Sequence, residues 1–280
     1  MRLRRALFAS AFLLTAALPG FAVPQAAAAT DPAVPQSTPA SAAPAQERVM
    51  VIGGSMAHGW KDPHDDSYIK RAFATLSALS GVQYTCLDRT ITGGSPSQWA
   101  AKQPGQFAQW LAKDKPQVVV ISWGLLNDLS AKTPLADFTK AVAAEIQTAL
   151  AAHAVVLVVS PPVVRASLTT YGPAETRMIA GEFQAPASFH SRNVFLFDLY
   201  QQMANYLQKH HQSIDVYAGD NWHPNSTGHA LAGNLLFNDL VQAFGTSPIT
   251  FQAAPAGGRT AAAVPASIRS APNQGKTGGR

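Results

Sequence analysis

The chain has 280 residues, of which 47% are hydrophobic, with a single cysteine and a formal net charge of +5. One cysteine excludes an internal disulfide framework, and the length leaves room for one domain with a sizeable core. The excess positive charge lies near the two ends of the chain, so residues 48–250 are neutral. A neutral domain gives no reason to expect nucleic acid as a partner.

The first 29 residues have the layout of a secretory signal peptide. Three arginines precede an apolar stretch, and small residues follow it up to Ala29. Pro19 and Gly20 interrupt the apolar stretch, which disfavours the alternative of an uncleaved membrane anchor. We therefore expect cleavage between Ala26 and Ala29, no stable membrane insertion afterwards, and a secreted or extracytoplasmic protein.

Two further segments are poor in large apolar side chains. Residues 30–47 consist mostly of Pro, Ala, Ser and Thr, and residues 251–280 of Ala, Gly, Pro and Ser with scattered Arg and Lys. Such segments cannot bury enough surface to offset the entropy of ordering them. We expect a flexible linker and a disordered basic tail on either side of one domain at residues 48–250.

Apolar, β-branched runs alternate with helical patterns along this domain. The runs are residues 48–54, 82–88, 117–124, 154–160 and 193–198. Between them apolar residues recur at helical spacing, as in Phe138, Val142 and Ile146. The pattern predicts a mostly parallel, five-stranded sheet with helices on both faces. Cys86 lies in the second run and is expected to be buried and inert. In such sheets ligands bind at the carboxyl ends of the strands.

The first run ends on Gly53-Gly54-Ser55. Glycines permit a tight turn, and a serine that follows the strand directly presents its hydroxyl at the rim of the sheet. Taken alone, this motif is also typical of an ordinary turn.

Asp220 and His223 lie three residues apart, and Pro224 follows as a helix-opening residue. At this spacing a carboxylate can orient an imidazole and stabilise the imidazolium that forms when histidine accepts a serine proton. The alternative is a turn cap beside a surface histidine. His229, six residues further on, is expected to pack in the fold.

Two other loops offer hydrogen-bond donors. Asn127, after the third run, has an amide that can donate to a developing oxyanion. Gly93 and Gly94, after the second run, allow a backbone N–H to approach a ligand closely. Ordinary turns are the alternative interpretation of both loops.

In this order the four blocks resemble those of the SGNH hydrolases, also called the GDSL family of esterases and lipases. The resemblance covers about residues 48–245 and rests mainly on the Ser55 block and on DNWHPNSTGH. It implies a flavodoxin-like, three-layer α/β/α sandwich, the SGNH hydrolase fold. It also implies Ser55 as nucleophile, His223 as general base and Asp220 as the orienting acid.

The resemblance further implies an oxyanion hole formed by the backbone N–H groups of Ser55 and Gly93 and the side chain of Asn127. Gly94 is the alternative to Gly93 by one register. No metal and no organic cofactor are expected.

The chain departs from the family pattern at two places. Gly54 stands where the family has Asp in Gly-Asp-Ser, and the block from Gly124 to Asp128 has one residue more than Gly-x-Asn-Asp. The α/β-hydrolase elbow Gly-x-Ser-x-Gly fits less well, because residue 57 is Ala and the serine follows the first strand.

The function expected is that of a secreted serine esterase acting through an acyl-enzyme. Its substrate is a small-molecule or carbohydrate ester, such as an O-acetyl group or a short acyl ester. Trp60, Trp123 and Trp222 lie beside the catalytic blocks and are candidate substrate-binding residues, with core or rim packing as the alternative. Two other functions stay open: an acyltransferase that uses the same triad, and a catalytically silent carbohydrate-binding domain.

Overall fold

The computed structural model describes residues 45–253. The predicted signal peptide, nearly all of the linker and the tail from residue 254 lie outside the described residues, so these remain predictions. Within residues 45–253, no helix is both long and apolar enough to cross a membrane.

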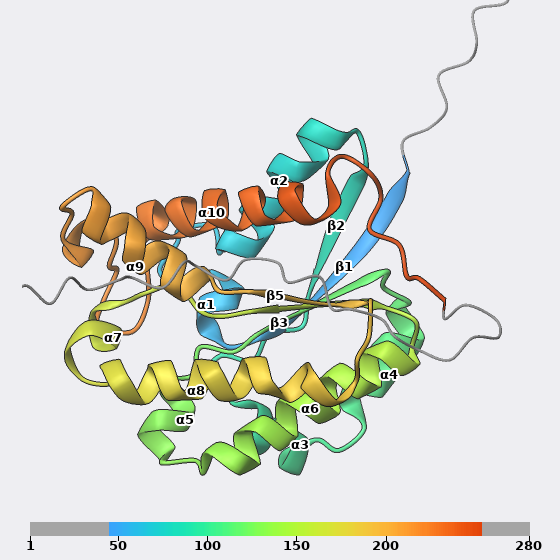
Figure 1. Ribbon diagram of the computed structural model, residues 1–280, viewed down its shortest axis with the longest axis horizontal. Coiled ribbons are helices and arrows are strands. Elements are labelled where there is room, and N and C mark those ends of the chain that lie inside the picture. Colours follow the sequence, from blue (N-terminus) through green and yellow to red (C-terminus); the bar gives the residue numbers. More distant parts are fainter. Residues whose placement is uncertain (1–44, 254–280) are drawn as a thin grey trace, which may run out of the picture. The chain divides into compact units, whose positions relative to one another are not determined.

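Each of the five apolar runs forms a strand of one parallel sheet (Figure 1). The strands are β1 (Gln46–Gly53), β2 (Gln83–Asp88), β3 (Val118–Ser122), β4 (Val155–Val159) and β5 (Val194–Phe197). Their order in the sheet is β2-β1-β3-β4-β5. The direction of winding reverses at β1, so the crevice at its carboxyl end is the expected ligand site.

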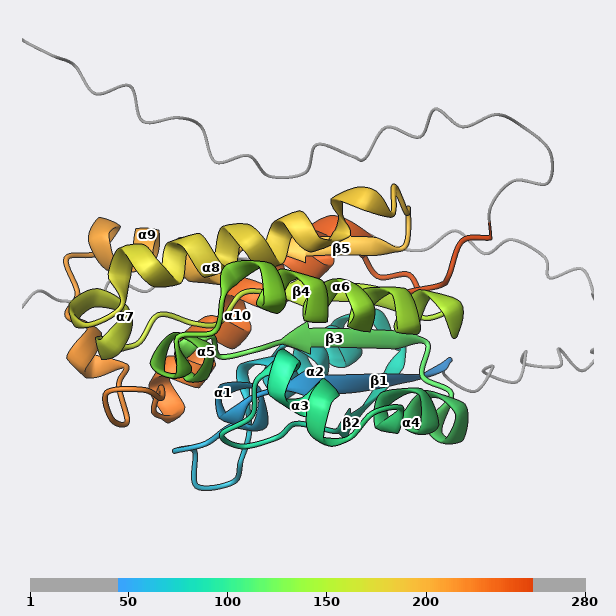
Figure 2. The same cartoon turned by 90° about the horizontal axis from the view of Figure 1, so that it is seen from below.

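The sheet is buried on both faces by two layers of helices (Figure 2). Val49 and Val51 of β1 pack in one core with helices α2 (Tyr68–Ser80), α9 (Leu199–Lys209) and α10 (Ser226–Phe244). Met50 and Ile52 pack in the other core, which is completed by α3 (Pro96–Lys102), α4 (Gln106–Asp114), α6 (Leu135–Ala151) and α8 (Gly172–Gln184). This alternation of neighbouring residues between two apolar cores confirms the predicted three-layer α/β/α fold.

The shorter elements lie in the connections. They are α1 (Ser55–His58), α5 (Leu126–Ala131), α7 (Arg165–Thr169), and the 3₁₀ turns η1 (Ala185–Ser188) and η2 (Ile214–Val216). The first of these, α1, follows β1 with only Gly54 between them, and α5 begins four residues after β3 ends.

Strand β1 begins at Gln46, two residues before the predicted start of the domain. Glu47 is buried, and its carboxylate accepts a hydrogen bond from the Ile249 backbone N–H at 3.2 Å. The two ends of the described chain therefore meet beside β1.

Candidate active site

Strand β1 stops on glycine because the backbone of β3 lies too close for a side chain. Gly53 has a φ of 155°, and a Cβ at this position would overlap the carbonyl oxygen of Ser122. Gly54 has an ordinary extended backbone, and a Cβ there would meet the Gly124 nitrogen at 3.5 Å, a normal contact. Gly53 is thus required by the fold, whereas the replacement of the family Asp by Gly54 is not imposed by lack of space.

Ser55, at the first position of α1, lies within hydrogen-bond distance of His223. The distance from Ser55 Oγ to His223 Nε2 is 2.9 Å, and the Ser55 residue is 9% exposed. His223 Nδ1 lies 2.9 Å and 3.1 Å from the two carboxylate oxygens of Asp220. When Nδ1 carries the proton and donates it to Asp220, Nε2 is free to accept the serine hydroxyl proton.

The loop that carries Asp220 and His223 is closed by its own backbone. Gly219 N–H donates to the His223 carbonyl at 2.9 Å, and the backbone N–H groups of Trp222 and His223 both donate to Asp220 Oδ1 at 2.8 Å. Asn225 then caps α10 by accepting from Gly228 N–H at 2.9 Å.

The same bonds act on the acid. Burial by itself raises the pKa of Asp220, but the Trp222 N–H and the His223 ring outweigh this effect and the pKa lies below its ordinary value. Asp220 is therefore ionised at neutral pH, as an acid that supports an imidazolium must be.

The loop after β3 holds Asn127 next to the loop after β2. Asn127 Nδ2 donates to the Gly94 carbonyl oxygen at 3.0 Å, which orients the amide and leaves its second N–H for another acceptor. Within this block Leu125 has a positive φ of 61°, a conformation in which side chains other than glycine are strained.

The two candidate glycines differ in what their N–H groups do. Gly94 N–H donates to the Ile91 carbonyl at 2.9 Å and is therefore already engaged, whereas Gly93 N–H has no acceptor among residues 45–253. Gly93 has a φ of 72°, which glycine adopts without strain. The geometry thus favours Gly93 over Gly94 as a donor.

The three tryptophans lie in different environments. Trp60 is 43% exposed, and its ring lies 6.3 Å from that of His223. Trp222 is partly buried and packs edge-on against Tyr171. The prediction for Trp123 is wrong: it is 1% exposed in the core, and its indole N–H donates to Glu145 at 2.9 Å.

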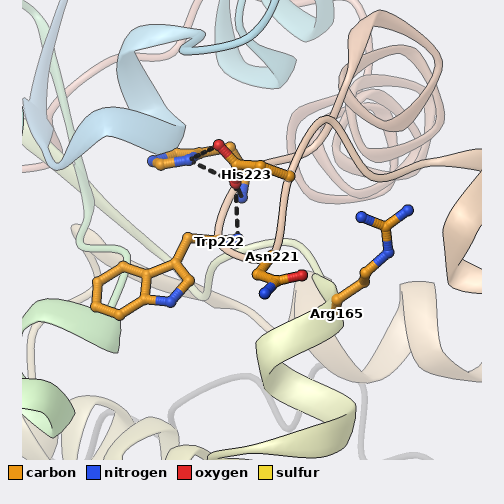
Figure 3. A pocket seen from close by; sticks show the side chains of 5 residues that line it. Arg165, Asn221, Trp222 and His223 are labelled. Carbon is orange, nitrogen blue, oxygen red and sulfur yellow. Dashed lines mark hydrogen bonds and ion pairs between the residues drawn. The ribbon is translucent and has the colours of Figure 1, made fainter.

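A pocket of about 500 Å³ adjoins the loop that carries Asp220 and His223, and its lining consists of Arg165, Asp220, Asn221, Trp222 and His223. In Figure 3, Trp222 and Arg165 project to opposite sides of this loop. No sequence pattern indicates Arg165, because the contact between α7 and the loop depends on the tertiary fold.

His229 packs inside the fold, as predicted. It is fully buried, stacks on Tyr68, and its Nε2 contacts the Trp60 carbonyl oxygen at 3.2 Å. In the part of the chain that the structure describes, no group of three or more His, Cys, Asp or Glu side chains could hold a metal ion.

Residues 51–231 match the model of the GDSL-like Lipase/Acylhydrolase family. The chain belongs to this family. The match spans all four blocks, from the strand that precedes Ser55 to the start of α10. No curated protein matches the sequence.

Several solved structures share the fold of this GDSL-family chain. A lipase/acylhydrolase from Enterococcus faecalis is 18% identical with a TM-score of 0.55, and the match covers 69% of this chain and 95% of that one. The esterase EstA from Pseudoalteromonas sp. is 16% identical, with a TM-score of 0.52 and coverages of 70% and 97%. A catalytic mutant of Axe2, an acetylxylan esterase from Geobacillus stearothermophilus, is 12% identical, with a TM-score of 0.57 and coverages of 72% and 95%.

At these identities the structural likeness establishes the fold, and the family match identifies the class of reaction. The protein is an ester hydrolase of the GDSL family.

Proposed function

We propose that the protein is a secreted serine esterase in which Ser55, His223 and Asp220 form the catalytic triad. The observation that carries the proposal is the continuous hydrogen-bond chain from Ser55 Oγ through the His223 ring to Asp220. Ser55 begins α1 just after β1, and Asp220 and His223 lie in the loop before α10, all at the carboxyl edge of the sheet.

In this mechanism Ser55 Oγ attacks the ester carbonyl carbon while its proton moves to His223 Nε2. Asp220 remains ionised and stabilises the imidazolium. The tetrahedral intermediate then collapses: the bond to the alcohol oxygen breaks, and His223 gives its proton to the leaving alcohol. Water, deprotonated by the same histidine, attacks the acyl-Ser55 ester and releases the carboxylic acid.

The charge that develops on the carbonyl oxygen needs donors that are already in place. Three are proposed: the N–H of Ser55 at the start of α1, the N–H of Gly93, and the second N–H of the Asn127 amide. The bond from Asn127 to the Gly94 carbonyl holds the amide beside the glycine loop before substrate arrives. Such prior orientation avoids reorganisation during the reaction.

We propose a carbohydrate O-acetyl ester as the substrate class. The support is aromatic surface beside the base: Trp60 is 43% exposed next to His223, and Trp222 lines the adjoining pocket. Exposed indole rings present an apolar face for packing and an N–H for hydrogen bonding, a combination that suits the face of a sugar ring. An acetylxylan esterase has the same fold. Secretion, expected from residues 1–29, would bring the enzyme to such substrates outside the cytoplasm.

The proposal is tested by hydrolysis of p-nitrophenyl esters and of acetylated xylo-oligosaccharides. The proteins compared are the wild type, Ser55→Ala, and Ser188→Ala as a matched control at an exposed serine of η1. We expect the wild type and Ser188→Ala to release acetate at equal rates and Ser55→Ala to release none above background. Equal rates for all three folded proteins would refute the proposal.

Transfer to a sugar hydroxyl would use the same residues with a different acceptor. Chromatographic analysis of the products, with and without an unacetylated oligosaccharide, distinguishes the two reactions. Free acetate as the sole product in both cases identifies a hydrolase, and acetylated acceptor identifies a transferase.

A further inference from the structure

A lysine contacts the carboxylate of the proposed acid, Asp220, at the oxygen that accepts no backbone hydrogen bond. Lys61 Nζ lies 3.6 Å from Asp220 Oδ2, whereas both backbone N–H bonds to Asp220 reach Oδ1. His223 Nδ1 is within hydrogen-bond distance of both oxygens. The ammonium and the imidazole therefore share one carboxylate.

The loop that carries Lys61 is fixed to the active site at several points. Trp60 N–H donates to the Ser55 carbonyl at 3.0 Å, and the Trp60 carbonyl oxygen contacts His229 Nε2 at 3.2 Å. Lys61 itself has a φ of 74°, an uncommon conformation for a residue with a side chain. The backbone from which the half-exposed Lys61 side chain extends is thus held next to Ser55.

The opposite loop makes room for the lysine stem. A Cβ on Gly219 would lie 2.8 Å from Lys61 Cβ, so a larger residue at 219 would push the stem away from Asp220. The approach of Lys61 to the acid therefore depends on the absence of a side chain at the neighbouring position.

The other charged groups around the site are compensated elsewhere. Arg165, on the pocket wall, has its Nε 2.6 Å from Asp215, and Asp62, next to Lys61, pairs with Arg71 at 3.0 Å. Burial lowers the pKa of His229, so this residue is neutral at neutral pH. Among the described residues, Lys61 is the one lysine or arginine in ion-pair contact with Asp220.

We propose that Lys61 is a positioning residue that shares the Asp220 carboxylate with His223 and thereby favours the neutral form of the imidazole. This inference rests on the proposed function of His223 as general base. A second positive charge at the same carboxylate opposes protonation of the ring, and a general base must be neutral to accept the serine proton. Lys61 therefore extends the working range of the enzyme toward lower pH.

The test is a titration of the His223 ring nitrogens by NMR in wild type, Lys61→Met, Lys61→Arg and Lys113→Met. Lys113 is an exposed lysine near the end of α4, at the opposite edge of the sheet, and serves as the matched control for loss of one charge. The pH dependence of kcat/KM for a neutral ester is measured on the same proteins.

We expect Lys61→Met to raise the titration midpoint of His223 by about half a pH unit, since the pair is partly exposed to solvent and therefore screened. The acid limb of the kcat/KM profile should move by the same amount. Lys61→Arg and Lys113→Met should keep the wild-type midpoint.

An unchanged midpoint in Lys61→Met, or an equal shift in Lys113→Met, would overturn the inference. A uniform fall of activity at every pH without a midpoint shift would also overturn it, because it would mark a purely structural role. The NMR titration needs no turnover, so it decides the influence of Lys61 on the ring even if the wild type cleaves no ester, an outcome that refutes the proposed function instead.

Discussion

Glu145 provides a prediction about stability that follows directly from the core. It lies on α6 with 6% of its surface exposed, and its Oε2 accepts the indole N–H of Trp123 at 2.9 Å. Its other oxygen, Oε1, has no hydrogen-bond partner among residues 45–253. Burial raises the pKa of Glu145 to about 8. The hydrogen bond from Trp123 lowers this pKa and the negative charge of Asp128 raises it, but burial is the largest effect.

The raised pKa makes the folded domain sensitive to pH in a defined window. Below about pH 4.5 the carboxyl is protonated in both the folded and the unfolded chain, so its full contribution to stability is present. Between there and about pH 8 the unfolded chain loses the proton while the folded chain keeps it, and stability falls by about 1.4 kcal/mol for each pH unit. At pH 7 the accumulated loss is on the order of 3 kcal/mol.

Glu145→Gln removes this loss and keeps an oxygen for Trp123. The new amide N–H₂ needs an acceptor in the core, which costs roughly 1–2 kcal/mol. We therefore expect the variant to be more stable than the wild type by about 1–2 kcal/mol at pH 7 and less stable at pH 4.5. Urea unfolding between pH 4.5 and 8, followed by tryptophan fluorescence, gives both free energies.

The comparison has an internal control in Glu175 of α8, whose pKa is raised by burial to about 7. Glu175→Gln should flatten the pH dependence over a narrower range that ends near pH 7. Parallel stability curves for Glu145→Gln and the wild type across the whole range would refute the reasoning.

Three further predictions concern the site and its surroundings. Asn127→Ala should lower kcat by about 10²–10³ in steady-state ester hydrolysis, the usual loss for one oxyanion donor, and a wild-type kcat would remove Asn127 from the mechanism. Trp60→Ala should raise KM for acetylated xylo-oligosaccharides while leaving hydrolysis of p-nitrophenyl acetate nearly unchanged; equal effects on both esters would argue against sugar contact. Cys86 is only partly buried, whereas the sequence predicted a buried thiol, yet desolvation still raises its pKa to about 12. A thiol reagent at pH 8 should therefore label the native protein far more slowly than the urea-unfolded protein, and equal labelling rates would contradict an inert thiol.

The three central strands β1, β3 and β4 were predictable because they are buried on both faces, which leaves runs of apolar residues in the sequence. The edge strands β2 and β5 are only partly buried. The proposed triad could be predicted because Asp220 and His223 are three residues apart in one turn, and because β1 leads directly into Ser55. Both signals are local, so they survive without knowledge of the tertiary fold.

Trp123 was misplaced because its position directly after β3 suggests the rim of the site. The alternation of side chains along a strand indicates the observed position: Ile121 and Trp123 are two residues apart, so both face the core that α6 completes. The contact between Lys61 and Asp220 depends on segments that are distant in the sequence. Lys61 reaches Asp220 only because of its left-handed backbone and the missing side chain at Gly219, and neither relation can be read from the sequence.

The most direct test of the triad is reaction of the purified protein with a fluorophosphonate, followed by intact mass measurement and peptide mapping. An activated serine should take up one phosphonyl group per chain, on Ser55, and Ser55→Ala should take up none. His223→Ala, which removes the base and leaves Ser55 in place, should react far more slowly. Absence of the adduct from folded wild-type protein, or its location on another residue, would contradict the role assigned to Ser55.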